Sequence, residues 1–222
     1  MNVQTTTSLQ PGEARCPGPS AQDIIAADGQ DVPAVLREQS YRFLGDADIP
    51  TERYTSRAFH DLEVARMWST VWQFACREEE IPEPGDYMEY GIADFSFLVV
   101  RTEAGDINAY VNSCLHRGTQ LRPSDSAGSA TQFRCPFHGW TWNLDGSLKE
   151  IPCRWDFPKV TDEEFRLPEV KVARWGGFVW INMDENAGPL EEWLEVLPKH
   201  FANWPLENRY TAVHVQKVLP AN

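Results

Sequence analysis

The sequence predicts a mostly β protein in which an antiparallel β domain is flanked by helices. Apolar and polar residues alternate over several short stretches in the centre of the chain, as they do in half-buried strands. Two breaks between these stretches, Glu103-Ala104-Gly105-Asp106 and Asn143-Leu144-Asp145-Gly146-Ser147-Leu148, contain the residues typical of hairpin turns. Helix-like spacing of apolar residues occurs only before and after this centre.

The first third of the chain is predicted to contain one substantial helix. Residues 1–45 are rich in Thr, Ser, Pro, Gly and Asp, and only Val35-Leu36 could begin a turn or two of helix, so we expect poor order at the start. An amphipathic helix is predicted over residues 56–75, and we expect its apolar face to lie in the core. The apolar residues near helical spacing are Phe59, Leu62, Met67, Val71 and Phe74.

Strands dominate the sequence after Pro82-Glu83-Pro84-Gly85. The alternation predicts strands at Tyr87–Ile92, Ser96–Arg101, Ile107–Asn112, Val170–Trp175 and Gly177–Asn182. A short helix is predicted at Leu190–Leu197 and a last alternating strand at Tyr210–Val218. The centre of the chain is therefore expected to be one antiparallel domain.

The charge of the chain restricts its partners. The 222 residues carry a formal net charge of -13, which argues against binding to nucleic acid or to anionic membranes. The apolar runs at Phe95–Val100 and Gly177–Ile181 are far shorter than a membrane span, and no basic segment precedes an apolar one at the N-terminus. We expect a soluble, cytoplasmic protein.

The five cysteines are scattered, which fits a reducing compartment where cysteine is either buried or a metal ligand. Cys76 follows an apolar run, and Cys16 and Cys153 lie beside proline in irregular sequence. We interpret these three as core or loop residues. The other two, Cys114 and Cys135, each have a histidine nearby.

Two Cys/His pairs follow predicted strands. They are Cys114-Leu115-His116 and Cys135-Pro136-Phe137-His138, with eighteen residues between His116 and Cys135. Two thiolates and two imidazoles could form a tetrahedral zinc site, although structural zinc usually takes Cys-x2-Cys and His-x3-His pairs. The alternative is a [2Fe-2S] cluster in which histidines replace both cysteines on one iron. Two loops with one ligand of each kind meet that requirement directly.

The segments Cys114-Leu115-His116-Arg117-Gly118 and Cys135-Pro136-Phe137-His138-Gly139-Trp140 resemble the two cluster-binding loops of a Rieske protein. They are similar to those of the Rieske non-heme iron oxygenases, the ring-hydroxylating dioxygenase α subunits, over roughly residues 55–205. The resemblance implies that Cys114 and Cys135 bind the inner iron and that His116 and His138 bind the outer iron. The longer spacing between the loops is attributed to a polar bulge at 124–129.

The resemblance also indicates which kind of cluster to expect. Respiratory Rieske proteins, as a family, have a disulfide between the loops and hydroxyl donors to the cluster sulfurs. Thr119 and Phe137 stand in place of those cysteines here, and Trp140 and Trp142 in place of those donors. Without donors that stabilise the reduced state, we expect a low-potential cluster of the oxygenase type.

The resemblance implies a division of the chain into three parts. Residues 1–45 would form a partly disordered extension, 46–208 the Rieske domain with flanking helices, and 209–222 the start of a truncated α+β catalytic domain. This segment would be the electron-transfer part of an oxidoreductase, taking electrons from a reductase or ferredoxin. A mononuclear non-heme Fe(II) is expected only in the full-length protein, which would form a homo-oligomer or an α/β hetero-oligomer.

No catalytic residue is predicted within these 222 residues. A facial triad needs two histidines and a carboxylate, and His60, His200 and His214 have no suitable spacing, so we assign them to structure or solvent. Two other functions stay open. The chain could be a stand-alone Rieske-type ferredoxin, or a zinc-stabilised interaction module without a redox role.

Overall fold

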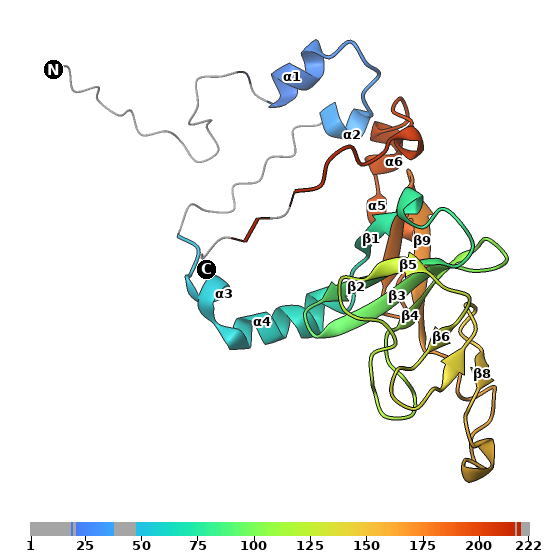
Figure 1. Cartoon of the computed structure of the whole chain (residues 1–222). Helices are drawn as coiled ribbons and strands as arrows, with labels where there is room; N and C mark the ends of the chain where they lie inside the picture. Colours follow the sequence, from blue (N-terminus) through green and yellow to red (C-terminus); the bar gives the residue numbers. More distant parts are fainter. Residues whose placement is uncertain (1–18, 20, 38–47, 216, 219–222) are drawn as a thin grey trace.

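Two antiparallel sheets form the centre of the protein (Figure 1). The computed structural model describes residues 19, 21–37, 48–215 and 217–218. The larger sheet has the strand order β1-β10-β9-β4-β3-β2-β5, and the smaller has the order β6-β7-β8. The predicted mostly antiparallel β domain is confirmed.

The strands are short, and most of them were predicted. They are β1 (Gln73–Arg77), β2 (Asp86–Ile92), β3 (Phe95–Arg101), β4 (Ile107–Val111), β5 (Ala127–Ser129), β6 (Phe133–Arg134), β7 (Thr141–Trp142), β8 (Leu148–Glu150), β9 (Glu169–Trp175) and β10 (Phe178–Asn182). All five strands expected from the alternating pattern are present within one residue at each end. The hairpin expected at the Asp145-Gly146 turn joins β7 to β8.

The helices lie before and after the strands. They are α1 (Ala21–Ala27), α2 (Ala34–Arg37), α3 (Glu52–Thr55), α4 (Arg57–Glu63), α5 (Leu190–Leu194) and α6 (Leu197–His200), with short π or 3-10 segments η1 (Val64–Trp68), η2 (Glu78–Glu80), η3 (Arg154–Asp156) and η4 (Leu206–Asn208). None of the helices within the described ranges has the length and hydropathy needed to cross a membrane.

Strand β3 is apolar at successive positions because both of its faces are buried. Leu98 and Val100 belong to one core cluster, which also contains the residues of the small sheet. Phe97 and Val99 belong to a second cluster, together with residues of β1 and β10. The strand therefore separates two hydrophobic cores, and one of them supports the Cys/His loops.

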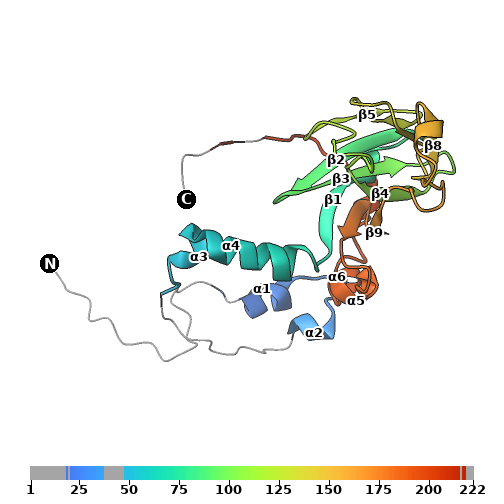
Figure 2. The same cartoon turned by 90° about the horizontal axis from the view of Figure 1, so that it is seen from below.

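The helix predicted over residues 56–75 is shorter than expected, and its apolar face is not in the core. The helical part ends at Trp68. Residues Gln73–Arg77 form β1 instead, because they pair with β10, and Trp72 directly before them is buried. Leu62 and Met67 remain 49% and 37% exposed. Figures 1 and 2 show that α4 projects away from the sheets.

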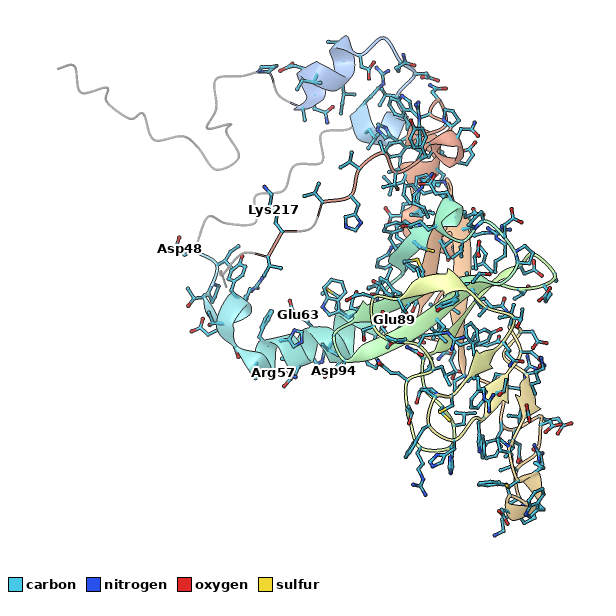
Figure 3. All side chains as sticks on the ribbon, in the orientation of Figure 1. Asp48, Arg57, Glu63, Glu89, Asp94 and Lys217 are labelled. Carbon is cyan, nitrogen blue, oxygen red and sulfur yellow. The ribbon has the colours of Figure 1, made fainter. Side chains whose placement is uncertain are left out.

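An exposed ion pair joins α4 to the rest of the described chain. Arg57 at the start of α4 lies 4.0 Å from the carboxylate of Asp94, in the turn between β2 and β3 (Figure 3). Pairs as exposed as this contribute little to stability. The helix is therefore held mainly by its covalent connection to β1.

Four further predictions are corrected or limited by the structure. Residues 127–129 of the expected polar bulge form the edge strand β5 against β2. The helix expected at 190–197 is interrupted at Glu195, which has a φ of 50°. The expected last strand is absent, since residues 210–215, 217 and 218 have no regular structure. Most of residues 1–45 fall outside the described ranges. The part that is described contains α1 and α2.

The β7–β8 turn gives a test of the core beneath it. A Cβ at Gly146, which has a φ of 77°, would lie 2.5 Å from Cε1 of the buried Tyr110. Gly146→Ala should lower the free energy of unfolding by about 3 kcal/mol or more, since strain from overpacking adds to the cost of positive φ. Chemical denaturation measures this change.

Gly105→Ala is the matched control for Gly146→Ala. Gly105 also has a positive φ, of 89°, but no atom lies within 4 Å of the added Cβ. This variant should lose only about 1 kcal/mol. Equal losses in the two variants would show that Tyr110 does not restrict the turn.

Candidate metal centre

Two loops with the same backbone geometry carry the four predicted ligands. The first loop, residues 114–119, follows β4, and the second, residues 135–140, joins β6 to β7. In each loop the cysteine amide donates to the carbonyl five residues later, and the glycine amide four residues later donates back to the cysteine carbonyl. These bonds are Cys114 N to Thr119 O, 2.8 Å; Gly118 N to Cys114 O, 2.8 Å; Cys135 N to Trp140 O, 2.8 Å; and Gly139 N to Cys135 O, 3.1 Å.

The glycine in each loop is required by the backbone. Gly118 and Gly139 have φ values of 74° and 77°, in the left-handed region where a side chain is strained. Each loop therefore makes a tight turn directly after its histidine or one residue later. The two loops therefore have the same backbone hydrogen bonds and the same glycine conformation. This holds although the histidine follows the cysteine by two residues in the first loop and by three in the second.

The two cysteines lie together inside the protein. Cys114 and Cys135 are each 3% exposed and are not in a disulfide. Burial raises the pKa of the Cys114 thiol, and the neighbouring Cys135 thiol raises it further, whereas backbone N–H groups of His116 and Arg117 oppose this rise. A metal ion is what ordinarily holds buried thiols in the deprotonated form.

The two histidines also lie together. The rings of His116 and His138 have centroids 4.8 Å apart and are inclined by 67°. Burial lowers the pKa of His116, and the nearby His138 and Arg117 lower it further, which favours the neutral imidazole that binds metals. Nδ1 of His116 is buried and has no hydrogen-bond partner. An unpaired buried nitrogen is costly, and a metal ion would satisfy it.

The donors therefore form one thiol pair and one imidazole pair. Across the described ranges, no three His, Cys, Asp or Glu side chains converge as they do around a single metal ion. A two-iron group needs a different arrangement, with two protein ligands on each iron. The residues present fit such a group better than they fit a tetrahedral zinc ion.

Aromatic side chains fix the first histidine more firmly than the second. The indole of Trp140 stacks on His116, with centroids 5.1 Å apart and planes 3° apart, and Phe157 meets the same ring edge-on at 5.6 Å. His138 is exposed, and its neighbour Phe137 is 60% exposed. Trp140 and Trp142 are both buried core residues.

Asn112, a buried residue that shapes the first loop, could not be identified from the sequence. Its Oδ1 accepts hydrogen bonds from the amides of Leu121, at 2.9 Å, and Arg122, at 3.0 Å. Its Nδ2 donates to Ser96 Oγ, at 3.0 Å, and to the Arg122 carbonyl, at 2.8 Å. All four bonding positions of the amide are used. Asn112, directly after β4, therefore holds the segment before the first loop against the segment after it, at Leu121 and Arg122.

The other predicted cysteines have the expected structural positions. Cys76 is buried in the second core cluster, where burial raises the pKa of its thiol to about 12. Cys153 is exposed in the irregular segment before η3. Cys16 lies outside the described residues. Only Cys114 and Cys135 are therefore placed together.

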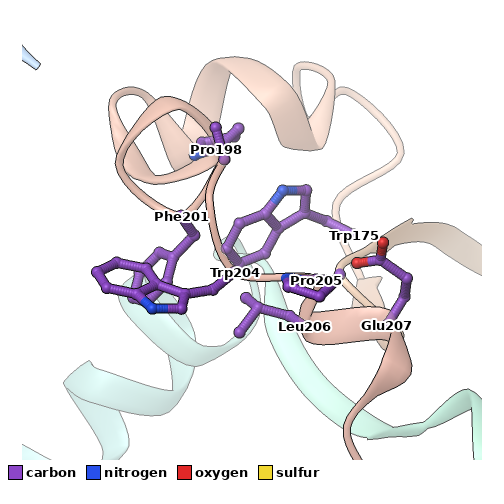
Figure 4. Close-up of a pocket in the computed structure, with 9 residues that line it drawn as sticks. Trp175, Pro198, Phe201, Trp204, Pro205, Leu206 and Glu207 are labelled. Carbon is purple, nitrogen blue, oxygen red and sulfur yellow. The ribbon is translucent and has the colours of Figure 1, made fainter. Parts of the chain in front are cut away.

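The remaining histidines lie on other elements. His60 is half-buried on α4, His214 is exposed in irregular chain rather than in the expected strand, and His200 ends α6. The His200 ring packs against Phe201 and Trp204, at 5.0 and 5.7 Å. Figure 4 shows the nearby cavity of about 320 Å³, in which Phe201 and Trp204 pack on each other beside Trp175.

Comparison with known proteins identifies the two loops. Residues 71–161 match the family model described as the Rieske [2Fe-2S] domain. Choline monooxygenase from Beta vulgaris is 31% identical over 176 residues, which are 74% of this chain and 39% of that protein. The α subunit of chlorobenzene dioxygenase from Cupriavidus sp. is 32% identical over 142 residues, 64% of this chain and 31% of that protein.

Solved structures give the same result. Naphthalene 1,2-dioxygenase from Rhodococcus sp., bound to indole, superposes with a TM-score of 0.59 at 35% identity, over 63% of this chain and 32% of that one. The apo form of the quaternary ammonium Rieske monooxygenase CntA gives a TM-score of 0.66 at 29% identity, over 70% of this chain and 45% of that one. The chain spans between about a third and a half of these relatives.

An antiparallel sheet that supports two paired Cys/His loops defines a Rieske-type iron–sulfur domain. The chain contains a Rieske [2Fe-2S] domain, and over this part it is similar to dioxygenase α subunits and to Rieske monooxygenases.

Removal of the Asn112 side chain should loosen the first loop. Asn112→Ala leaves the buried amides of Leu121 and Arg122 without acceptors, so we expect a loss of about 3 kcal/mol in the free energy of unfolding. Hydrogen exchange at these two amides should become faster in the folded protein. Both effects are measurable by denaturation and by amide exchange.

Asn108→Ala is the control on the same strand. Asn108 is half-buried and donates only to the Tyr110 hydroxyl, at 2.8 Å, which itself still donates to the Leu144 carbonyl. Its loss should cost about 1 kcal/mol and leave the two loop amides protected. Unchanged exchange at Leu121 and Arg122 in Asn112→Ala would contradict the role of Asn112.

Proposed function

We propose that this chain holds a Rieske [2Fe-2S] cluster and that its own contribution is electron transfer. Cys114 and Cys135 bind the inner iron, and His116 and His138 bind the outer iron. The observation that carries this proposal is the pairing of thiol with thiol and imidazole with imidazole, with Nδ1 of His116 buried and unpartnered. When bound, the cluster supplies reversible one-electron storage.

The residues around the ligands have distinct tasks in this proposal. The hydrophobic core excludes water from the thiols, and the backbone N–H groups after Cys114 stabilise negative charge on sulfur. Trp140 and Phe157 hold the His116 ring in one orientation. His138 is the exposed ligand, so electrons are exchanged with other redox centres on its side of the site.

The similar α subunits suggest where these electrons go. In an enzyme of this kind a reductase or ferredoxin would supply electrons to the Rieske site, and this site would pass them to a mononuclear non-heme iron site where oxygen and substrate react. We propose that His60, His200 and His214 do not form that second site, because His60 lies on α4, His200 ends α6 and His214 lies in irregular chain. The relatives include both monooxygenases and dioxygenases. We therefore propose the transfer of electrons through the Rieske site and no particular oxygenation reaction.

Metal analysis and spectroscopy test the cluster assignment. Chain produced with ample iron and sulfide should contain about two irons and two acid-labile sulfides per molecule. After reduction it should give the electron paramagnetic resonance signal of a mixed cysteine and histidine cluster. Stoichiometric zinc under these conditions would refute the proposal.

Substitution of the histidines separates ligands from structural residues. His116→Ala and His138→Ala should each abolish the mixed-ligand signal, because one iron loses half of its protein ligands. His60→Ala changes a half-buried histidine on α4 and should leave the signal intact. A signal that persists in either ligand variant would mean that another residue binds the outer iron.

A further inference from the structure

The two ligand loops have no covalent link between them. Cys114 and Cys135 are free thiols. The first loop follows β4 and the second joins β6 to β7, yet the cluster requires a fixed distance between them. Some other interaction must therefore set that distance.

The guanidinium of Arg122 bridges the two loops. Nη1 donates to the carbonyl of Leu121, at 2.8 Å, two residues after the first loop ends. Nη2 donates to the carbonyl of Gln132, at 3.1 Å, three residues before Cys135. Apart from the hydrogen bond between the Cys114 and Cys135 thiols, this is the one side-chain hydrogen bond among the described residues that runs from segment 112–122 to segment 131–142.

Two aromatic rings hold the same guanidinium in place. It lies 5.2 Å from the ring centre of Tyr87 and 5.2 Å from that of Phe133, and the two rings are nearly perpendicular to each other. Cation–π contacts of this kind orient a planar guanidinium. Phe133 begins the strand that leads into the second loop, so the contact adds to the bridge.

The base of the Arg122 side chain is fixed as well. Asn112 bonds both the amide and the carbonyl of Arg122, and it does so from the strand that enters the first loop. No carboxylate of the described chain forms an ion pair with Arg122. The planar guanidinium fork of Arg122 contacts neutral carbonyls and aromatic rings. The shape of the fork, rather than an ion pair, therefore determines this interaction.

We propose that Arg122 is a positioning residue that sets the separation of the two cluster loops. It takes the place of a covalent cross-link, and it acts on the cluster through the carbonyls of Leu121 and Gln132 and through the ring of Phe133. This inference rests on the proposed cluster. It predicts that loss of the fork alters the electronic structure and the retention of the cluster.

The test compares Arg122→Met and Arg122→Lys in the cluster-loaded 222-residue chain. Methionine retains the apolar part of the side chain without donors, and lysine retains the charge without the planar fork. Both variants should show shifted or broadened electron paramagnetic resonance lines. Both should also lose visible absorbance to a chelator about tenfold faster than the unaltered chain, equivalent to about 1.4 kcal/mol.

Arg101→Met is the matched control. Arg101 is half-buried and also bridges two carbonyls, those of Ile81, at 2.7 Å, and Gly105, at 3.0 Å, but these lie away from the ligand loops. The control should lower the thermal unfolding midpoint as Arg122→Met does. Its resonance lines and its rate of cluster loss should match those of the unaltered chain.

Three results would overturn the inference while leaving the proposed function intact. The first is unaltered resonance lines and cluster loss in Arg122→Met. The second is that Arg122→Lys keeps the resonance lines and the rate of cluster loss of the unaltered chain while Arg122→Met does not. This result would show that the positive charge, and not the planar fork, positions the loops. The third is an equal effect in Arg101→Met, which would assign it to general destabilisation. If the unaltered chain itself lacks the mixed-ligand signal, the proposed function fails and the inference fails with it.

Discussion

The burial of the two cysteines proposed as ligands is the constraint on which the rest of the structure depends. Cys114 and Cys135 belong to the same core cluster as Trp140, Trp142 and Tyr110. A thiolate in such a place is unfavourable unless metal and N–H groups stabilise its charge. The loops must therefore bring both sulfurs and their donors to one point inside the core. The double-sided burial of β3 supplies the rigid base beneath them.

Burial decreases steadily from the thiols to the imidazoles. The cysteines are almost fully buried, His116 is half-buried under Trp140 and Phe157, and His138 is exposed. In the proposed cluster this gradient keeps negative charge on the buried sulfurs close to N–H donors. It also brings one edge of the site to the surface, where electrons can be exchanged without opening the core.

The parts of the fold that were predictable are those that depend on local sequence. The five expected strands are present, the loop glycines have positive φ, and the cysteine and histidine of each proposed pair are separated by only one or two residues in the sequence. The helix was extended too far because Val71–Phe74 fit helical spacing as well as strand pairing. Strand β5 was missed since its three residues, Ala127–Ser129, are small and exposed, and only the free edge of β2 makes them a strand.

Asn112 and Arg122 could not be identified in advance, because most of their hydrogen-bond partners are main-chain atoms nine or ten residues away in irregular chain. Arg77 and Arg101 behave in a similar way: Arg77 bonds the carbonyls of Leu206 and Arg209, and Arg101 those of Ile81 and Gly105. A planar fork can satisfy two carbonyls at once in a fixed geometry, whereas lysine offers a single point charge. Main-chain carbonyls in irregular segments need such donors when they are shielded from water. The guanidiniums thus join separate segments of this acidic chain through backbone atoms, and the resulting contacts leave no periodic pattern in the sequence.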